Sequence, residues 1–345
     1  MSRSPGEPLL QVEGLRTWFP IKRGLLQRTT GHVQAVTDVD LEIAPASTLA
    51  LVGESGCGKT TVGRSILRLT PAQAGRVSFE GVDLMKLSEA KLRGYRRHIQ
   101  IIFQDPMASL NPRMRVRDSV AEGMRSFGIG RDEADRTERV KALFGKVQLD
   151  PGHIWRYPHE FSGGQRQRIC IARALAVEPR LIVCDEAVSA LDVSIQAQIL
   201  NLLSDLQRDL GIAYLFITHD LGVVRYLADR VAVMYLGRIV EAGTTEQIFS
   251  RPRHPYTRAL LAAAPSMDPD IRGEAPPVVG DVPSPSDPPS GCPFHPRCPE
   301  AMEQCERELP PVRQDAEGRV VCFLDSVVAP GAAESADPTG GEEFA

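Results

Sequence analysis

The stretch GESGCGKT, residues 53–60, brings together glycines, a lysine and a threonine at a spacing that suits phosphate binding. Glycines let the backbone turn its N–H groups toward a phosphate, and the first turn of a following helix adds partial positive charge. Lys59 is expected to reach the β- and γ-phosphates of a nucleotide, and the Thr60 hydroxyl to help hold Mg²⁺. A chance glycine-rich turn is disfavoured, because an apolar strand pattern precedes the motif and a helical pattern follows it.

A second candidate, LIVCDE at residues 181–186, places two carboxylates directly after four apolar residues. The apolar run predicts a buried strand, and ligands of open α/β sheets bind at the carboxyl ends of the strands. Asp185 is expected to hold Mg²⁺ through water, and Glu186 to polarise an attacking water. The plainer alternative is two solvent-exposed acids at a strand end, which is disfavoured in a chain that also carries a phosphate motif.

The third motif is FSGGQRQR, residues 161–168. Ser162 is a good helix N-cap, and Gly163 and Gly164 remove side-chain bulk where the backbone must approach something closely. The helix that follows directs its positive end outward, as at an anion-binding site. This combination resembles the signature motif of ATP-binding cassette (ABC) ATPases.

Three further residues match the pattern of that family in chain order. Gln104 in IIFQDP is similar to the Q-loop glutamine, Asp192 in SALD to the D-loop acid, and His219 in FITHD to the switch histidine. Taken singly, His219 could be a strand-end histidine and Gln104 a polar loop residue, but the order of all the motifs favours the family. The resemblance covers about residues 9–325 and implies ATP and Mg²⁺ as cofactors.

The resemblance also implies a role for each matching residue. The expected catalytic residues are Glu186, His219 and Lys59, and the expected Mg²⁺ ligands are Thr60, Gln104 and Asp185. The expected ATP-binding residues are Phe19, Gly53, Glu54, Ser55, Gly56, Cys57, Gly58, Lys59, Thr60, Thr61, Gln104, Ser162, Gly163, Gly164, Gln165 and Asp192. Phe19 would stack on adenine, with the adjacent Trp18 as the alternative. One cassette of this family cannot complete its own site, so residues 162–165 are expected to cover the nucleotide of a second cassette.

Hydrophobic patterning predicts the elements that position these motifs. Apolar runs at 48–52, 180–185 and 213–218 predict buried strands, and helical periodicity at 60–69, 193–210 and 220–229 predicts the helices between them. Such alternation favours an α/β fold with a largely parallel sheet covered on both faces. The resemblance implies a P-loop NTPase cassette with a RecA-like core, an antiparallel N-terminal β subdomain and a helical insertion, followed by a small cysteine-rich extension.

The expected domain boundaries follow changes in composition. The cassette is expected to span residues 1–250, with a charged helical subdomain at about 86–165. A C-terminal extension at 251–325 contains a proline-rich connector, and residues 326–345 are expected to form a disordered tail. Two departures from the family are Ala187 after the catalytic glutamate, where proline is usual, and threonine at position 60, where serine is common. Neither removes a functional group, so ATPase activity is expected.

Composition places limits on the cellular role. The 345 residues carry a net charge of −4, which argues against a nucleic-acid binder. The N-terminus shows no secretory signal, and no run of about 18 apolar residues occurs, so we expect a cytoplasmic protein that does not span a membrane.

The segments FQDPMASLNPRM, VSALDVSIQAQIL and RPRHPYTRALLAAAP resemble ATPase subunits of the peptide and nickel importers, above all those of oligopeptide or dipeptide permeases. This implies a second ATPase subunit, two transmembrane permease subunits, an extracytoplasmic binding protein and a place at the cytoplasmic face of the membrane. Nickel, glutathione or another small solute remains an alternative cargo. A non-transport ABC ATPase is a further alternative, but only 57 residues separate Gln104 from Ser162, too few for the coiled-coil insertion of DNA-repair members.

Four of the seven cysteines, Cys292, Cys298, Cys305 and Cys322, gather in the C-terminal extension. Four thiolates can hold Zn²⁺ or an iron–sulfur cluster, although the spacing lacks the close pair that is typical of structural zinc. Similar cysteine-rich tails in peptide-importer ATPases imply a [4Fe–4S] cluster, with His295 as a possible replacement ligand. The alternative is four free thiols in a small subdomain with Phe294 and Phe323 as its core. This segment is expected to lie outside the nucleotide site.

Overall fold

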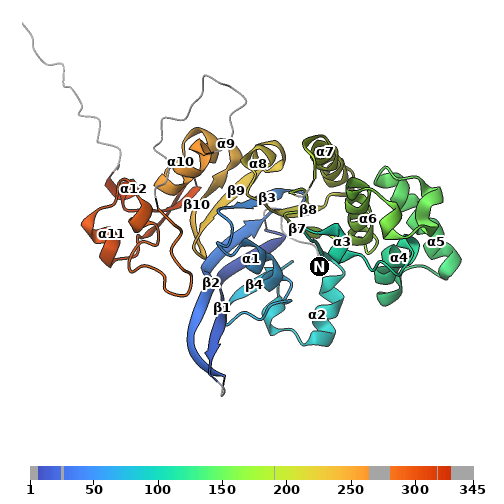
Figure 1. The fold of residues 1–345 in the computed structure, drawn as a ribbon, viewed down its shortest axis with the longest axis horizontal. Helices are drawn as coiled ribbons and strands as arrows, with labels where there is room; N and C mark the ends of the chain where they lie inside the picture. The colour runs from blue at the N-terminus through green and yellow to red at the C-terminus, as the bar shows by residue number, and fades with distance from the viewer. Residues whose placement is uncertain (1–6, 25–26, 190, 264–279, 317, 328–345) are drawn as a thin grey trace, which may run out of the picture.

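The computed structural model describes residues 7–24, 27–189, 191–263, 280–316 and 318–327. Its centre is an eight-stranded mixed sheet in the order β11-β12-β10-β9-β3-β8-β7-β6 (Figure 1). Five neighbouring strands are parallel: β6 (Ile99–Ile102), β7 (Leu181–Asp185), β8 (Ala213–Ile217), β3 (Thr48–Val52) and β9 (Arg230–Tyr235). Every residue of β3, β7 and β8 is buried, as a parallel sheet covered on both faces requires.

The helices that follow the parallel strands lie where the sequence predicted them. They are α1 (Lys59–Ile66), α7 (Val193–Leu210) and α8 (Leu221–Leu227). The apolar face of α7, with Ile199, Leu202 and Leu206, is buried. Gly211 ends α7 in a left-handed conformation (φ 66°), which glycine adopts without a Cβ clash.

A second sheet packs beside the first and is fully antiparallel, in the order β2-β1-β4-β5. Its strands are β1 (Leu10–Arg23), β2 (Arg28–Ile43), β4 (Ala74–Phe79) and β5 (Val82–Asp83), and the long β1–β2 ribbon projects from the body in Figure 1. Leu10, Val12 and Leu15 of β1 join one hydrophobic core with α1 and β3. The antiparallel N-terminal subdomain implied by the family resemblance is therefore present.

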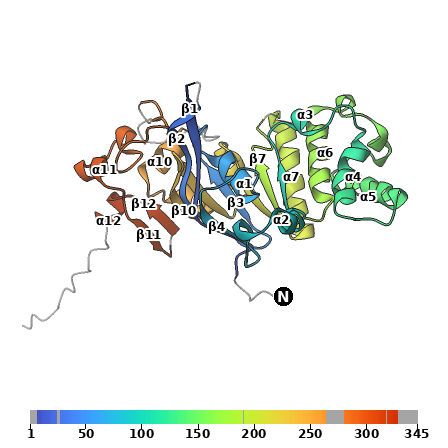
Figure 2. The same cartoon turned by 90° about the horizontal axis from the view of Figure 1, so that it is seen from below.

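Helices dominate the segment between β6 and β7. They are α3 (Pro106–Ser109), α4 (Val116–Ser126), α5 (Glu133–Lys146) and α6 (Gly163–Leu175), with 3₁₀ turns η2 (Pro151–Trp155) and η3 (Pro158–Glu160). Val120, Val140 and Phe144 are fully buried in their shared core. A further 3₁₀ turn, η1 (Leu84–Lys86), and α2 (Glu89–Arg96) precede β6. Figures 1 and 2 place α3–α6 at one end of the molecule and the described part of the C-terminal extension at the other.

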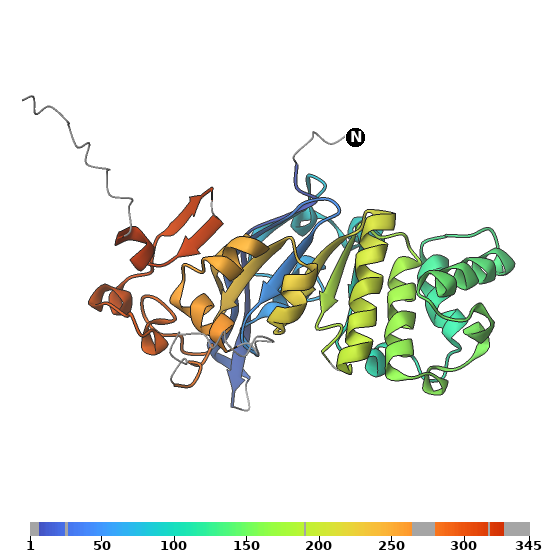
Figure 3. The same ribbon diagram turned by 90° about the horizontal axis from the view of Figure 1, so that it is seen from above.

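The C-terminal extension continues the central sheet. β10 (Arg238–Thr244) pairs antiparallel with β9 and, at Glu241 and Ala242, with β12 (Gly318–Val321), which in turn pairs with β11 (Val312–Asp315). The remaining elements are α9 (Thr245–Ser250), α10 (Pro255–Ala262), η4 (His295–Arg297), α11 (Glu303–Arg307) and α12 (Leu324–Val327). The helix α12 includes the first two residues of the predicted tail, and residues 328–345 lie outside the described ranges. Figure 3 shows the β11–β12 hairpin at the margin of the molecule.

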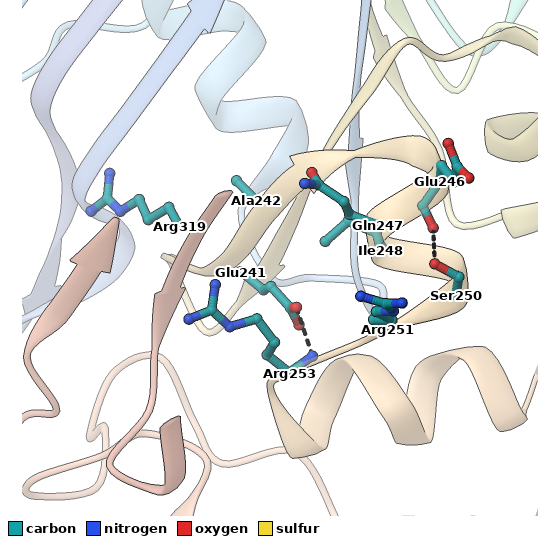
Figure 4. Close-up of a pocket in the computed structure, with 9 residues that line it drawn as sticks. All are labelled: Glu241, Ala242, Glu246, Gln247, Ile248, Ser250, Arg251, Arg253 and Arg319. Carbon is teal, nitrogen blue, oxygen red and sulfur yellow. Dashed lines mark hydrogen bonds between the residues drawn. The ribbon is translucent and has the colours of Figure 1, made fainter. Parts of the chain in front are cut away.

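A polar junction connects the extension to β10. Glu241, 2% exposed, accepts hydrogen bonds from the backbone N–H groups of Arg253 (2.8 Å) and His254 (3.0 Å) at the start of α10. Glu241 and Arg253 border a cavity of about 300 Å³ between β10, α9 and β12, which Figure 4 shows with its lining side chains. Arg253 also pairs with Asp325 (2.5 Å), and Arg319 with Asp40 of β2 (2.8 Å). The Arg253–Asp325 pair lies within the extension, whereas the Arg319–Asp40 pair, the hydrogen bonds to Glu241 and the pairing of β12 with β10 tie the extension to the cassette.

No helix in the described ranges is long and apolar enough to cross a membrane.

The buried histidine of this junction predicts a pH dependence of stability. Burial lowers the pKa of His254 to about 3, so its ring stays neutral while its Nδ1 accepts a hydrogen bond from the Tyr256 N–H. The unfolded chain takes up a proton near the ordinary histidine pKa of about 6.5. Stability from this residue is therefore complete above about pH 6.5 and falls as pH decreases, by at most about 1.4 kcal/mol per pH unit.

Urea unfolding across this range can isolate the effect by comparison with His254→Asn, which keeps an N-cap acceptor but cannot titrate. We expect the wild type to lose stability relative to this variant as the pH falls. His153→Asn, at a partly exposed position, is the matched control and should follow the wild type. Parallel pH curves for the wild type and His254→Asn would contradict the prediction.

Candidate nucleotide site

The phosphate loop lies between β3 and α1 and fits tightly against two other strands. A Cβ atom on Gly53 (φ 153°) would lie 2.1 Å from the Met234 carbonyl oxygen of β9. A Cβ on Gly58 (φ 108°) would lie 2.0 Å from the Ala35 carbonyl oxygen of β2. Only glycine avoids these clashes. The two motif glycines are therefore needed for the loop to pack against β9 and β2, as well as to expose its N–H groups.

Lys59 begins α1 and folds back over the loop. Its ammonium donates hydrogen bonds to the carbonyl oxygens of Gly53 (2.8 Å) and Glu54 (2.9 Å), and the residue is only 4% exposed. These acceptors are neutral, so they position the ammonium without cancelling its charge. A buried cation held in this way is suited to an anionic phosphate oxygen.

Two of the three residues expected to hold Mg²⁺ are in contact. The Thr60 hydroxyl on α1 donates a 2.7 Å hydrogen bond to Asp185 Oδ1 at the end of β7. Asp185 is 4% exposed, and burial raises the pKa of its carboxyl while the Thr60 hydrogen bond lowers it. Hard oxygen donors of this kind are the ligands that Mg²⁺ prefers, so the pair fits the predicted ion.

Glu186, Gln104 and His219 converge from the ends of three adjacent strands. Glu186 Oε2 accepts a 2.9 Å hydrogen bond from Gln104 Nε2, and Glu186 Oε1 lies 3.4 Å from His219 Nδ1. The Glu186 backbone is left-handed (φ 49°), although its N–H still donates to the Ile217 carbonyl of β8 (3.0 Å). Such a conformation costs a non-glycine residue roughly 1–3 kcal/mol and is typical of functional sites.

The signature segment forms a well-capped helix start. Ser162 Oγ accepts a hydrogen bond from the Gln165 N–H (3.3 Å), and Gln165 Oε1 accepts one from the Ser162 N–H (3.0 Å). A Cβ on Gly164 would lie 2.5 Å from Ile195 Cγ2, so its small size serves close packing of α6 against α7, which run side by side in Figure 3. Gly163 has more room, since the nearest atom to its Cβ position is Leu191 Cδ2 at 3.8 Å.

Two other predicted site residues lie elsewhere in the described chain. Asp192 is the N-cap residue of α7, after position 190, which lies outside the described ranges. Phe19 on β1 is 41% exposed, whereas Trp18 is engaged: its indole N–H donates to Thr37 Oγ1 (3.0 Å), and the Arg16 guanidinium lies 5.2 Å from its ring. This difference favours Phe19 as the ring available for stacking on a base.

Sequence reasoning missed the contact between the extension and the phosphate loop. Arg297 donates to both carboxylate oxygens of Glu54, at 2.8 and 3.0 Å, and the Tyr256 hydroxyl accepts a hydrogen bond from the Glu54 N–H (3.0 Å). The segment that carries the cysteines therefore contacts the phosphate loop through Arg297, although the cysteines themselves line a separate cavity. No local signal could have revealed it, because the two residues of the ion pair are 243 positions apart.

The four clustered cysteines line one small cavity. Cys292, Cys305 and Cys322 are buried and Cys298 is partly buried, with the buried Phe294 and Phe323 beside them. Burial raises the pKa of Cys292 and of Cys298 to about 11, so both thiols are protonated at neutral pH. In the described residues, no group of three or more histidine, cysteine or acidic side chains is arranged to hold a metal ion. The structure thus gives the expected cluster or zinc ion no support beyond the gathering of thiols.

Together these features define a P-loop ATPase with an inserted helical body. The phosphate loop and the acids follow strands of the mixed sheet, and the Ser-Gly-Gly-Gln segment begins helix α6 of the inserted body. Comparison with known proteins specifies the family. The family model described as ABC transporter matches residues 36–189, and that described as Oligopeptide/dipeptide transporter, C-terminal region, matches residues 240–305.

Relatives and solved structures agree. The chain is 51% identical over 321 residues to a Brucella ovis protein named "Putative peptide import ATP-binding protein", covering 93% of this chain and 99% of the relative. It is 56% identical over 264 residues to the Glutathione import ATP-binding protein of Salmonella paratyphi A, covering 76% of this chain and 42% of the relative.

Among solved structures, cbiO1 from Clostridium perfringens, part of an ABC transporter complex, superposes with a TM-score of 0.61 at 26% identity over 71% of this chain and 92% of its own. A dimeric ATP-binding cassette bound to ADP and Pi gives a TM-score of 0.60 at 25% identity over 68% of this chain and 98% of its own. The chain belongs to the ABC transporter family and is a transport ATPase.

The position of Glu186 generates a test of the catalytic assignment. Glu186→Gln keeps the size and an acceptor for Gln104 but removes the negative charge that would activate water. We expect ATP binding close to wild type and hydrolysis slower by about 10²–10⁴-fold, the usual contribution of a general base. Steady-state ATPase and a fluorescent-nucleotide titration measure the two effects.

Lys59→Ala, which removes the buried ammonium, serves as the binding-deficient control in the same titration. Hydrolysis near the wild-type rate in Glu186→Gln would exclude Glu186 as the catalytic base.

Proposed function

We propose that this chain is the ATP-hydrolysing subunit that powers import of peptides across the cytoplasmic membrane. The observation that carries the proposal is the C-terminal region at 240–305, which matches the oligopeptide/dipeptide transporter model and reaches the phosphate loop through Tyr256 and Arg297. Full-length similarity to proteins named for peptide import supports the same cargo. Glutathione is the second candidate, because a glutathione import protein is among the relatives, and nickel or another small solute is a further alternative.

We propose the sequence-assigned residues as the working parts of the ATP site. ATP with Mg²⁺ supplies the transferable phosphoryl group and much of the charge neutralisation when bound. Lys59 would hold the β- and γ-phosphates, and Thr60 with Asp185 would hold the ion, supported by their direct hydrogen bond. Glu186 would accept the proton of the attacking water, oriented by His219 and Gln104, both of which lie within reach of its carboxylate.

We further propose that two cassettes must meet to complete each site. None of the described hydrogen bonds joins the Ser162–Gln165 segment to the phosphate loop of the same chain. The α6 N-terminus carries partial positive charge and is exposed at Ser162, so it is suited to a phosphate held by another subunit. A second ABC ATPase subunit, two transmembrane permeases and an extracytoplasmic binding protein would form the complex at the cytoplasmic face of the membrane.

Reconstitution tests this role. The chain, expressed with its candidate permeases and second cassette, should co-purify with them, and proteoliposomes should take up labelled dipeptides or oligopeptides only with ATP and the binding protein. Glu186→Gln complexes should assemble but transport nothing. Uptake of glutathione or nickel without peptide uptake would show that the proposed peptide cargo is wrong. Purification without any membrane subunit would contradict the transport role.

For the four cysteines, the finer proposal is a [4Fe–4S] cluster, with Zn²⁺ as the alternative. Four thiols on one cavity are the donor set that such clusters use, and the family resemblance supports it. The raised pKa values of Cys292 and Cys298 do not oppose binding, because a metal displaces thiol protons. The role would be structural, since ATP hydrolysis requires no electron transfer.

Anaerobic purification with iron, sulfide and zinc analysis tests this proposal. We expect brown protein with about four iron atoms and four sulfides per chain, and loss of both in Cys298→Ser. Cys170→Ser, at a buried thiol in α6, is the matched control and should retain them. Bound zinc would favour the alternative, and colourless protein without metal would leave four free thiols.

A further inference from the structure

A charged side chain of the cysteine segment is buried against the phosphate loop. Arg297 ends the turn η4, immediately before Cys298, and its side chain is 7% exposed. It donates two hydrogen bonds to the Glu54 carboxylate, and its guanidinium also lies 5.8 Å from the Tyr235 ring. The Glu54 side chain is 29% exposed, so the pair is partly buried, and a two-pronged arginine–carboxylate pair of this kind is stronger and more directional than a fully exposed ion pair.

Glu54 is held at three points, and one of them is the nucleotide-site lysine. The Arg297 guanidinium binds the Glu54 side chain, and the Tyr256 hydroxyl accepts from its N–H. The carbonyl oxygen of Glu54 accepts from the Lys59 ammonium at 2.9 Å. The orientation of the Glu54 peptide therefore affects where the Lys59 ammonium lies, and two residues of the extension determine that orientation.

The extension residues that make these contacts are themselves fixed by aromatic packing. The rings of Phe294 and Tyr235 have centroids 5.2 Å apart, those of Phe294 and Tyr256 5.4 Å, and those of Tyr235 and Tyr256 4.7 Å. All three rings are essentially buried. This cluster lies between the thiol-lined cavity and the phosphate loop. The turn that carries Arg297 is therefore held in place by packed, buried rings.

Charge gives the contact a second effect. Glu54 is an acid inside a loop that must receive a polyanionic nucleotide, and an uncompensated carboxylate there would repel phosphate. The Arg297 guanidinium neutralises it. Removal of Arg297 should therefore weaken nucleotide binding both by loosening the loop and by restoring the negative charge of Glu54.

We propose that Arg297 is a positioning residue for the phosphate loop, through which the C-terminal extension sets the affinity of the site for nucleotide. The proposal rests on the nucleotide-binding role proposed above for the loop at residues 53–60. It assigns the extension a part in the ATP cycle, in addition to any part in assembly or metal binding.

The experiment compares Arg297→Ala, Glu54→Gln and the double variant in the intact transporter complex. For Arg297→Ala we expect the Kd for a fluorescent ATP analogue and the KM for ATP to rise by about tenfold or more, with kcat changed much less. Adding Glu54→Gln should recover much of the lost affinity, because the repelling charge is then gone. A residue that merely stabilised the fold would show no such rescue.

Arg319→Ala is the matched control, because it breaks another ion pair between extension and cassette, to Asp40 (2.8 Å), and none of the described hydrogen bonds or ion pairs joins either residue to the phosphate loop. Its KM should stay at the wild-type value. An unchanged Kd in Arg297→Ala, or equal losses in Arg297→Ala and Arg319→Ala, would overturn the proposal while leaving the ATPase assignment intact. Unchanged nucleotide binding in Lys59→Ala would instead overturn both.

Discussion

The phosphate loop packs very closely against neighbouring backbone, and the geometry of the candidate nucleotide site depends on this packing. Carbonyl oxygens of Met234 and Ala35 occupy the space where side chains of Gly53 and Gly58 would begin. The Gly237 N–H also donates to the Cys57 carbonyl oxygen (2.9 Å), so the turn between β9 and β10 supports the loop from outside. A loop held in this way does not need to reorganise around phosphate, and preorganisation of this kind is what electrostatic catalysis requires.

The parallel strands place the remaining chemistry beside that loop. β6, β7 and β8 are neighbours in the sheet, so Gln104, Glu186 and His219, which follow their carboxyl ends, meet although the first and the last are 115 positions apart in the sequence. Gln104 is followed directly by α3 and the helical body, which lies at the opposite end of the molecule from the extension. The Gln104 side-chain amide therefore links that helical body to the Glu186 carboxylate. The site therefore joins both ends of the molecule.

Local patterns in the sequence were sufficient for the cassette core. Strand 48–52 and helix 193–210 agree with the structure to the residue, because continuous apolar runs and a 3.6-residue period bounded by glycine are strong signals. The phosphate loop and the strand-end acids were predictable because their chemistry demands fixed residue types. The pairing of β12 with β10 and the Glu54–Arg297 contact were not predictable, since each joins distant segments without any periodic pattern. Gly164 was expected to let the backbone approach a bound anion closely. In the structure its small size also makes room for the Ile195 side chain of the same chain.

The addition of β12 and β11 to the central sheet has a consequence for solubility. Without them, β10 would present an open row of backbone donors and acceptors, the kind of edge through which chains join into aggregates. In the intact chain the outermost strand is β11, which is short and carries Arg313 and Asp315, features that discourage such joining. A shortened chain that ended after α9 would keep the motifs for ATP and yet expose this edge. The extension therefore covers a sheet edge of the cassette that could otherwise promote self-association, whether or not its cysteines bind a metal.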